Sequence, residues 1–220
     1  MDKIQTENLD DILVIAITGG LGTGKSTVSK LISKNGYPII NTDLLAKKII
    51  SQSKEIQQQI IQNFGNNSID ENGNLNSLVL SKLVFGEKIE NKKNLELLNS
   101  IIHPPVIDEM IKEIEELAKN NHKIIFVESA LIFEANLEDG FDYIIVVDAP
   151  IEKRIEWFKK RTNLTEKEFL DIQNSQLSQE YKKNNADFII ENYKTTEELE
   201  KSVNTLLNII KILPKNEKIK

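Results

Sequence analysis

Residues 19–26 have the composition and spacing of a phosphate-binding segment. They read Gly-Gly-Leu-Gly-Thr-Gly-Lys-Ser and fit the pattern G-x-x-x-x-G-K-[ST]. The glycines let main-chain N–H groups approach a ligand without intervening side chains, and a helix that begins directly afterwards adds its positive end. A glycine-rich turn without a ligand would leave Lys25 and Ser26 unexplained. We therefore predict that residues 19–26, the phosphate loop, bind a nucleotide.

The residue types of the phosphate loop indicate which nucleotide and which metal it binds. The pattern predicts that Lys25 contacts the β- and γ-phosphates of ATP and that the Ser26 hydroxyl is a ligand of Mg²⁺. The predicted ATP-binding residues are Gly20, Leu21, Gly22, Thr23, Gly24, Lys25, Ser26 and Thr27. ATP is thus the expected phosphoryl donor, and Mg²⁺ the expected cofactor.

Two carboxylates follow short apolar runs, as acidic residues of nucleotide sites often do. Asp43 comes after residues 39–42, and Glu128 comes after residues 124–127. Ligands of open α/β sheets bind at the carboxyl ends of strands. Asp43 is therefore a candidate base for the acceptor hydroxyl, and Glu128 a candidate carboxylate for Mg²⁺, directly or through water. The alternatives are a helix N-cap at Asp43 and a surface charge at Glu128.

Spacing alone leaves three other polar residues open. His103 stands before two prolines, at an expected helix boundary, where a histidine is more often a capping or packing group than a catalyst. Arg154 and Arg161 are the only arginines of the sequence, and their separation of seven residues places them on one helix face. They fit either a solvated helix or a lid that clamps phosphate.

Short apolar runs alternate with segments of helical periodicity along the chain. The runs are rich in β-branched residues, as buried parallel strands are, and cover residues 12–18, 38–41, 123–128, 142–148 and 187–190. The helical segments are 25–34, 43–63, 76–85, 91–101, 105–119, 151–160, 165–183 and 195–213. This alternation predicts an α/β fold of the P-loop NTPase type, with a parallel five-stranded sheet flanked by helices.

The spacing of the runs also suggests how the chain is divided. The helical stretch between the second and third runs is far longer than a crossover connection needs. We expect a single domain over residues 1–220, with a helical acceptor-binding insertion at about 44–120 and a helical lid at about 151–185.

Composition excludes several classes of protein. The net charge of −6 is unsuited to holding duplex nucleic acid through its phosphates, and the absence of cysteine excludes disulfides and thiolate chemistry. Residues 12–17, the longest apolar run, are too short to span a bilayer, and the acidic residues 1–11 do not resemble a signal peptide. We expect a cytoplasmic protein without nucleic-acid or membrane partners, and the sequence carries no indication of its oligomeric state.

Several motifs follow one another in an order typical of one kinase family. Residues 18–27 read TGGLGTGKST, residues 41–47 read NTDLLAK, and residues 131–134 read LIFE. They are similar to T-G-G-I-G-S-G-K-S-T, to D-A-D-x-x-A-R and to the end of D-x-P-L-L-F-E. Shorter matches lie at residues 64–65, 72–75, 84–85, 103–104, 176–178, 186–187 and 192. From about Ile12 to Asn192 the chain thus resembles the dephospho-coenzyme A kinases.

This resemblance implies a reaction and a set of residues that perform it. The reaction is transfer of the γ-phosphoryl group of ATP to the ribose 3′-hydroxyl of dephospho-CoA, which yields coenzyme A and ADP in the last step of coenzyme A biosynthesis. The implied catalytic residues are Lys25, Asp43 and Arg161, and the implied acceptor-binding residues are Asp43, Lys47 and His103.

Departures from the family pattern keep two alternatives in view. The differing residues include Asn41, Lys47, Ser77, Glu128, Ala130 and Trp157, and three of them, Lys47, Ser77 and Trp157, stand where the family has arginine. Lys47 keeps the charge without the bidentate geometry, whereas the other two lose the charge. The alternatives are another P-loop kinase acting on a nucleotide or nucleoside, and a nucleotide-binding protein without kinase activity.

Overall fold

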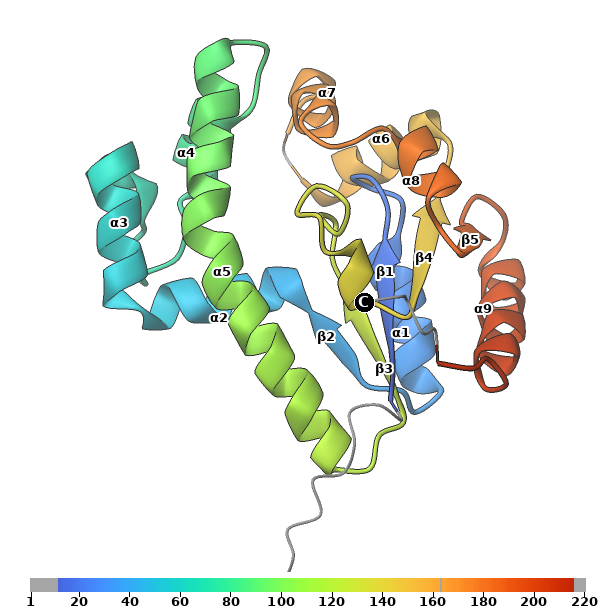
Figure 1. The fold of residues 1–220 in the computed structure, drawn as a ribbon. Coiled ribbons are helices and arrows are strands. Elements are labelled where there is room, and N and C mark those ends of the chain that lie inside the picture. Colours follow the sequence, from blue (N-terminus) through green and yellow to red (C-terminus); the bar gives the residue numbers. More distant parts are fainter. Residues whose placement is uncertain (1–11, 163, 216–220) are drawn as a thin grey trace, which may run out of the picture.

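The structure is a computed structural model that describes residues 12–162 and 164–215. In these residues one sheet is formed by five strands, β1 (Leu13–Thr18), β2 (Ile39–Asn41), β3 (Ile124–Glu128), β4 (Tyr143–Asp148) and β5 (Phe188–Glu191). The strands are all parallel and lie in the order β2-β3-β1-β4-β5 (Figure 1). The predicted α/β fold with a parallel five-stranded sheet is confirmed.

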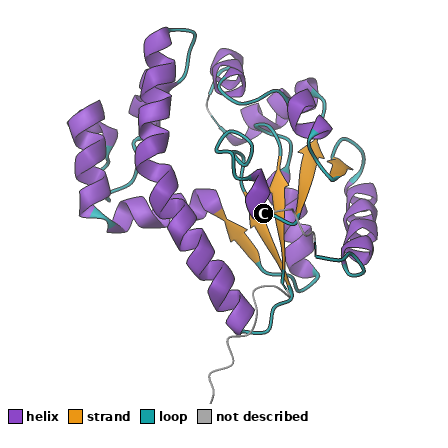
Figure 2. Ribbon diagram, viewed as in Figure 1, coloured by secondary structure: helices purple, strands orange, loops and turns teal. Residues whose placement is uncertain are grey.

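Helices surround the sheet on both faces, as Figure 2 shows. The α-helices are α1 (Lys25–Lys34), α2 (Thr42–Gln52), α3 (Lys54–Phe64), α4 (Ser77–Val84), α5 (Ile89–Lys119), α6 (Ile151–Arg161), α7 (Glu166–Asn174), α8 (Gln179–Asn184) and α9 (Thr196–Ile210). Two short 3₁₀ turns, η2 (Asn66–Ser68) and η3 (Glu138–Gly140), complete the described elements. None of the helices within residues 12–162 and 164–215 is both long and apolar enough to span a membrane.

The central strand β1 divides the core into two layers because its side chains alternate between the faces of the sheet. Ile15 and Ile17 point to the face that α1 and α9 cover, and both are fully buried. Ala16 points to the opposite face, where it packs in one cluster with Val106 and Met110 of α5. Burial on both faces explains why β1 is an apolar run without polar alternation.

Helices α2 to α5, which we call the insertion, have an apolar core of their own. Ile50, Ile60, Val84 and Leu98 are buried against one another, one from each helix. In Figure 1 α3, α4 and the first half of α5 lie away from the sheet, while the second half of α5 runs along it. The single helix α5 thus connects the core of the insertion with the core of the sheet.

The continuity of α5 contradicts the expected boundary near His103. Residues 91–101 and 105–119 were expected as two helices, but they belong to one helix that contains Pro104 and Pro105. Each proline removes an intrahelical hydrogen bond, and Figure 1 shows a bend in α5 of the kind that proline causes. The helix continues because both of its halves are anchored by apolar packing.

Two expected helices are interrupted by serine caps. The segment 43–63 divides at Ser53, which is extended and whose hydroxyl accepts a hydrogen bond from the Ile56 N–H at 3.3 Å. The segment 165–183 divides before Ser178, whose hydroxyl accepts from the Tyr181 N–H at 3.1 Å. A serine side chain that satisfies the first N–H groups of a new helix favours a start at that point. Periodicity alone does not reveal such breaks, since the apolar pattern continues across them.

Candidate active site

The phosphate loop connects β1 to α1 through a left-handed glycine. Gly24, which directly precedes α1, has a φ of 93°, and a Cβ atom placed on it would lie 2.0 Å from Nδ2 of Asn192. That amide group donates a hydrogen bond to the Thr23 carbonyl oxygen at 2.8 Å. Both the backbone conformation and the close approach of Asn192 therefore require glycine at this position.

Main-chain N–H groups of the phosphate loop fall into two sets. Those of Gly20 and Leu21 donate to side-chain oxygens, at 2.8 and 3.1 Å. Those of Gly22, Gly24, Lys25 and Ser26 have no hydrogen-bond acceptor among the described residues. Unpaired N–H groups at the start of a helix bind anions, because the helix dipole adds to their partial positive charge. The second half of the loop is therefore suited to hold phosphate.

The Lys25 ammonium group is folded over the phosphate loop. Its Nζ donates to the carbonyl oxygens of Gly19 and Gly20, at 2.9 and 3.2 Å. The pKa of Lys25 falls from 10.5 to about 8, because burial, together with the positive charges of Lys182 and Arg154, outweighs the opposite effect of the Asp43 and Glu128 carboxylates. An anionic ligand would raise this pKa again, so the site is electrostatically prepared for phosphate.

Ser26 and Glu128 lie together at the carboxyl end of the sheet. The Ser26 hydroxyl donates to Oε1 of Glu128 at 2.7 Å, and the Thr42 hydroxyl donates to the Glu128 carbonyl oxygen at 3.2 Å. Glu128 is only 6% exposed, so the alternative that it is a surface charge is wrong. No group of three or more His, Cys, Asp or Glu side chains suited to a metal occurs in the described part of the chain. The hydroxyl and the carboxylate nevertheless fit Mg²⁺, which takes oxygen ligands and usually keeps waters and substrate phosphates in its shell.

Asp43 lies in the first turn of α2 with its carboxylate free of a capping role. The cap is Asn41, whose Oδ1 accepts from the Leu44 N–H at 3.0 Å, so the alternative that Asp43 caps the helix is wrong. The carboxylate keeps access to solvent. Partial desolvation raises its pKa, with a further upward contribution from Glu128, whereas the nearby Lys25 charge lowers it. Asp43 thus combines the position and the raised proton affinity of a general base.

Asp43 and His103 line a common hollow of about 150 Å³, which we call the acceptor recess. Its walls come from α2, from α5 and from the loop after β3, and are largely apolar. They comprise Thr42, Ala46, Asn99, Ile102, Val106, Ile107, Met110, Ser129, Leu131, Ala135 and Leu137. His103 is half-buried, and burial lowers its pKa, which favours the neutral imidazole. Lys47 lies one turn after Asp43, is exposed, and acts on the Asp43 carboxylate by its charge.

Comparison with known proteins identifies the family. The family model for dephospho-CoA kinase matches residues 13–198. A dephospho-CoA kinase of Fusobacterium nucleatum is 39% identical over 192 residues, which cover 87% of this chain and 95% of that protein. The chain belongs to the dephospho-CoA kinase family. It is therefore a kinase, an ATP-dependent phosphotransferase.

Solved structures agree with the fold of a dephospho-CoA kinase. The TT1252 protein of Thermus thermophilus is 29% identical, with a TM-score of 0.73, and the match covers 92% of this chain and 99% of that one. The dephospho-CoA kinase of Campylobacter jejuni, at 24% identity, has a TM-score of 0.63, with 90% and 96% of the chains covered. The second comparison concerns the fold alone.

The two arginines of this dephospho-CoA kinase family member lie in different surroundings. Arg154 is 3% exposed, and its Nε donates to the Leu21 carbonyl oxygen at 2.7 Å. Its Nη2 donates to Oε1 of Gln173, and its guanidinium lies 5.8 Å from the centre of the Phe169 ring. Arg161 is exposed at the last position of α6. The structure thus places Arg154 against the phosphate loop, whereas the catalytic role of Arg161 stays a prediction.

Sequence reasoning did not single out two side chains that reach the site of this kinase. Gln179 accepts from the Gly20 N–H, and Lys182 is fully buried beside Glu134. Glutamines and lysines are common on exposed helices, so their residue types carry no signal. The available signal was indirect, since Gln176 and Glu134 belong to the short segments that resemble the family.

Proposed function

We propose that this chain transfers the γ-phosphoryl group of ATP to the ribose 3′-hydroxyl of dephospho-CoA and releases coenzyme A and ADP. Membership of the family supports the reaction. The observation that carries it for this chain is the position of Asp43 on the wall of the acceptor recess, near the Lys25 charge. The Asp43 carboxylate does not cap α2, and its pKa is raised. A carboxylate so placed can take the proton of an acceptor hydroxyl while the phosphate loop holds the donor.

Three groups divide the chemical work in this proposal. Asp43 accepts the proton of the 3′-hydroxyl, and its Oδ atoms orient that hydroxyl for attack on the γ-phosphorus. Lys25 leaves the carbonyl oxygens of Gly19 and Gly20 and donates instead to phosphate oxygens. Arg161 approaches the transferred group when the lid closes and offsets the charge on its equatorial oxygens. Because phosphoryl transfer depends mainly on positioning and charge, no covalent enzyme intermediate is needed.

Mg²⁺ is the proposed metal, and the Ser26 hydroxyl and the Glu128 carboxylate are the residues that would hold it, Glu128 directly or through water. Their existing hydrogen bond supports this assignment, because it brings two oxygen atoms together beside the phosphate loop. A metal ion held there would supply positive charge that partly neutralises the phosphate oxygens of ATP. Glu128 also keeps the Ser26 hydroxyl oriented before nucleotide arrives.

We assign the acceptor to the insertion, at about residues 44–120, and the closing lid to about residues 151–185, both within a single domain of residues 1–220. The acceptor recess takes the adenosine portion next to Asp43, with His103 and Lys47 at its side. A cleft of about 810 Å³ is lined by α4 and α5 of the insertion and by α7 and α8 of the lid, and Asn99 lines both hollows. This cleft offers room for the rest of dephospho-CoA.

The partners in this proposal are ATP and dephospho-CoA, with neither nucleic acid nor membrane among them, and the proposed location is the cytoplasm. The net charge of −6 argues against nucleic acid as a partner. The supply of ATP in the cytoplasm supports the proposed location.

One assay separates the proposal from its alternatives. The purified protein is supplied with ATP, Mg²⁺ and, in separate reactions, dephospho-CoA, nucleosides and nucleoside monophosphates, and the products are identified by mass. We expect a gain of one phosphoryl group on dephospho-CoA alone. Phosphorylation of a nucleoside or monophosphate, with none of dephospho-CoA, would show a different kinase. ATP binding without any product would show a nucleotide-binding protein that lacks kinase activity.

A further inference from the structure

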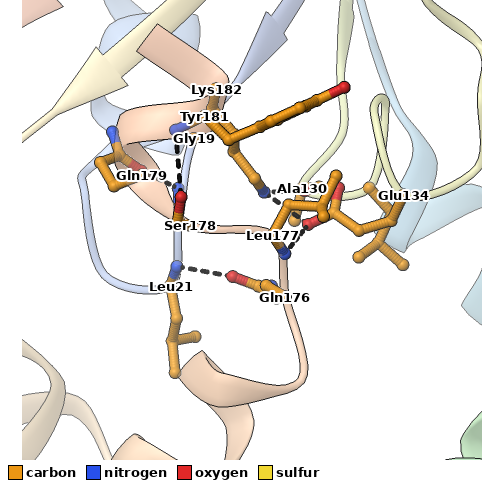
Figure 3. Close-up of polar contacts among 12 residues, drawn as sticks. Gly19, Leu21, Ala130, Glu134, Gln176, Leu177, Ser178, Gln179, Tyr181 and Lys182 are labelled. Carbon is orange, nitrogen blue, oxygen red and sulfur yellow. Dashed lines mark hydrogen bonds and ion pairs between the residues drawn. The ribbon is translucent and has the colours of Figure 1, made fainter. Parts of the chain in front are cut away.

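A buried ion pair joins the lid to the loop after β3. Lys182 of α8 is fully buried, and its Nζ lies 2.7 Å from Oε1 of Glu134 and 2.9 Å from the Ala130 carbonyl oxygen (Figure 3). The same Oε1 accepts a hydrogen bond from the Leu177 N–H at 3.0 Å. Glu134 therefore holds both ends of a six-residue stretch of the lid, Leu177 at the start and Lys182 at the end.

The pair is poorly explained as a device for stability. The second carboxylate oxygen of Glu134, Oε2, is buried and has no hydrogen-bond partner among the described residues. Removing two charges from water costs several kcal/mol each, and a buried pair offsets that cost only when its remaining polar atoms are also satisfied. Apolar residues of similar volume could fill the same space at least as favourably. We therefore interpret the charged pair as a device that fixes the position of residues 177–182 of the lid.

Two glutamines, Gln179 within the stretch held by Glu134 and Gln176 directly before it, contact the phosphate loop. Oε1 of Gln176 accepts from the Leu21 N–H at 3.1 Å, and Oε1 of Gln179 accepts from the Gly20 N–H at 2.8 Å. The amide nitrogen of Gln179 donates in turn to the Val147 carbonyl oxygen at the end of β4, at 3.0 Å. In Figure 3 the Gln176 and Gln179 side chains point toward the phosphate loop, while Lys182 points toward Glu134.

We propose that Glu134 and Lys182 are positioning residues for phosphoryl transfer, because their ion pair holds Gln176 and Gln179 against the first half of the phosphate loop. The inference rests on the proposed role of that loop in binding ATP. The glutamines fix the first half of the loop, so that the N–H groups of Gly22, Gly24, Lys25 and Ser26 stay unpaired and correctly placed for phosphate.

The choice of amides and of glycine fits this role. An amide oxygen accepts a main-chain hydrogen bond without bringing a negative charge near the phosphates, as a carboxylate would. A Cβ atom on Gly20 would lie 3.0 Å from Oε1 of Gln179 and 2.6 Å from Nη2 of Arg154, so the contact needs glycine on the loop side. The Gln179 side chain of the lid can therefore approach the main chain of the phosphate loop closely because residue 20 is glycine.

The test compares single and double replacements of the pair. Lys182→Met and Glu134→Gln each leave one member unpaired, whereas the double variant removes the charge of both. Lys183→Met is the matched control, since Lys183 is the next residue on α8 but pairs with Asp148 and Glu180 instead. Melting temperature, kcat, KM for each substrate and the Kd for ATP in a direct titration are measured for every variant.

We expect wild type and Lys183→Met to phosphorylate dephospho-CoA equally well. Lys182→Met should lower kcat/KM for ATP by about 10²-fold, the effect of a displacement near 1 Å, with a smaller change in KM for dephospho-CoA. The double variant should regain the melting temperature but not kcat/KM. Recovery of both would overturn the proposal, because the pair would then serve stability alone.

A second variant keeps the test decisive if Lys182→Met does not fold. Gln179→Leu leaves the ion pair intact and removes the hydrogen bonds of the glutamine amide with the Gly20 N–H and with the Val147 carbonyl oxygen. We expect its Kd for ATP to rise about tenfold, which corresponds to about 1.4 kcal/mol. An unchanged Kd, or tighter ATP binding, would overturn the proposal, since tighter binding would make the glutamine a competitor of phosphate. The direct titration needs no acceptor, so an enzyme inactive with dephospho-CoA would refute the proposed function without deciding this inference.

Discussion

Arg154 and Leu21 are joined by a hydrogen bond of 2.7 Å, from the arginine Nε to the leucine main-chain carbonyl oxygen. The bond ties α6 to the phosphate loop at the residue whose N–H is held by Gln176. Both main-chain polar groups of Leu21 are therefore occupied by side chains from the region of the proposed lid. The conformation of the loop depends on this region even before a nucleotide is bound.

Replacement of Arg154 should affect both the fold and ATP binding. Arg154→Ala removes charge-assisted hydrogen bonds to Leu21 and Gln173, and the free energy of unfolding should fall by about 2 kcal/mol or more. Arg154→Lys should restore little, because an ammonium lacks the planar fork that reaches both acceptors. Chemical denaturation and ATP titration measure these effects. Lys160→Ala, which changes an exposed lysine of the same helix, is the control and should match the wild type.

Arg161 is expected to act on the transition state. Arg161→Ala should lower kcat by about 10²-fold, the scale of one removed oxyanion donor, with little change in the Kd for ATP. Arg161→Lys should recover little of the loss, because the charge remains without the bidentate geometry. Steady-state kinetics decide the matter. Turnover equal to the wild type in Arg161→Ala would mean that this exposed position is only a solvated end of α6.

Asp43→Asn should remove the general base while keeping the shape of the site. We expect kcat with dephospho-CoA to fall by about 10²- to 10⁴-fold and the Kd for ATP to stay unchanged. Since desolvation raises the Asp43 pKa, the wild-type rate should decline on acidification at a higher pH than an ordinary aspartate would give. This acidic limb should disappear in the variant. A variant that keeps most of its turnover would rule out the assigned role.

Lys25→Met should separate stability from activity. Turnover should be abolished with every acceptor, yet at pH 7 and without nucleotide the variant should melt at a higher temperature than the wild type. The reason is that the folded-state pKa of Lys25, about 8, lies below the ordinary value of 10.5, so the buried charge destabilises the fold at pH 7. From pH 8 to 10.5 the unfolded chain binds more protons, wild-type stability gains with pH, and the difference between the proteins should shrink. Calorimetry over this pH range checks the sign, and a variant that unfolds would assign Lys25 a structural role.

The sequence by itself determined the strands and the phosphate loop. β-Branched apolar runs predict the strands to within about one residue at each end, because buried parallel strands need such side chains on both faces. The phosphate loop was predictable for a related reason, since its glycines and its Lys-Ser pair are demanded locally by the backbone and by phosphate. Asp43 and Glu128 followed from their places at strand ends.

Only the tertiary structure decided which distant side chains meet at that loop. Gln179 and Gly20 are 159 residues apart in the chain, and no local pattern records such a pairing. The same holds for Lys182 and Glu134, whose burial depends on how α8 packs against the loop after β3. α5 continues through Pro104 because packing on both of its halves outweighs the local preference against proline. Local preferences determine most of the helices and strands, whereas the sum of many weak long-range contacts determines which of them pack together.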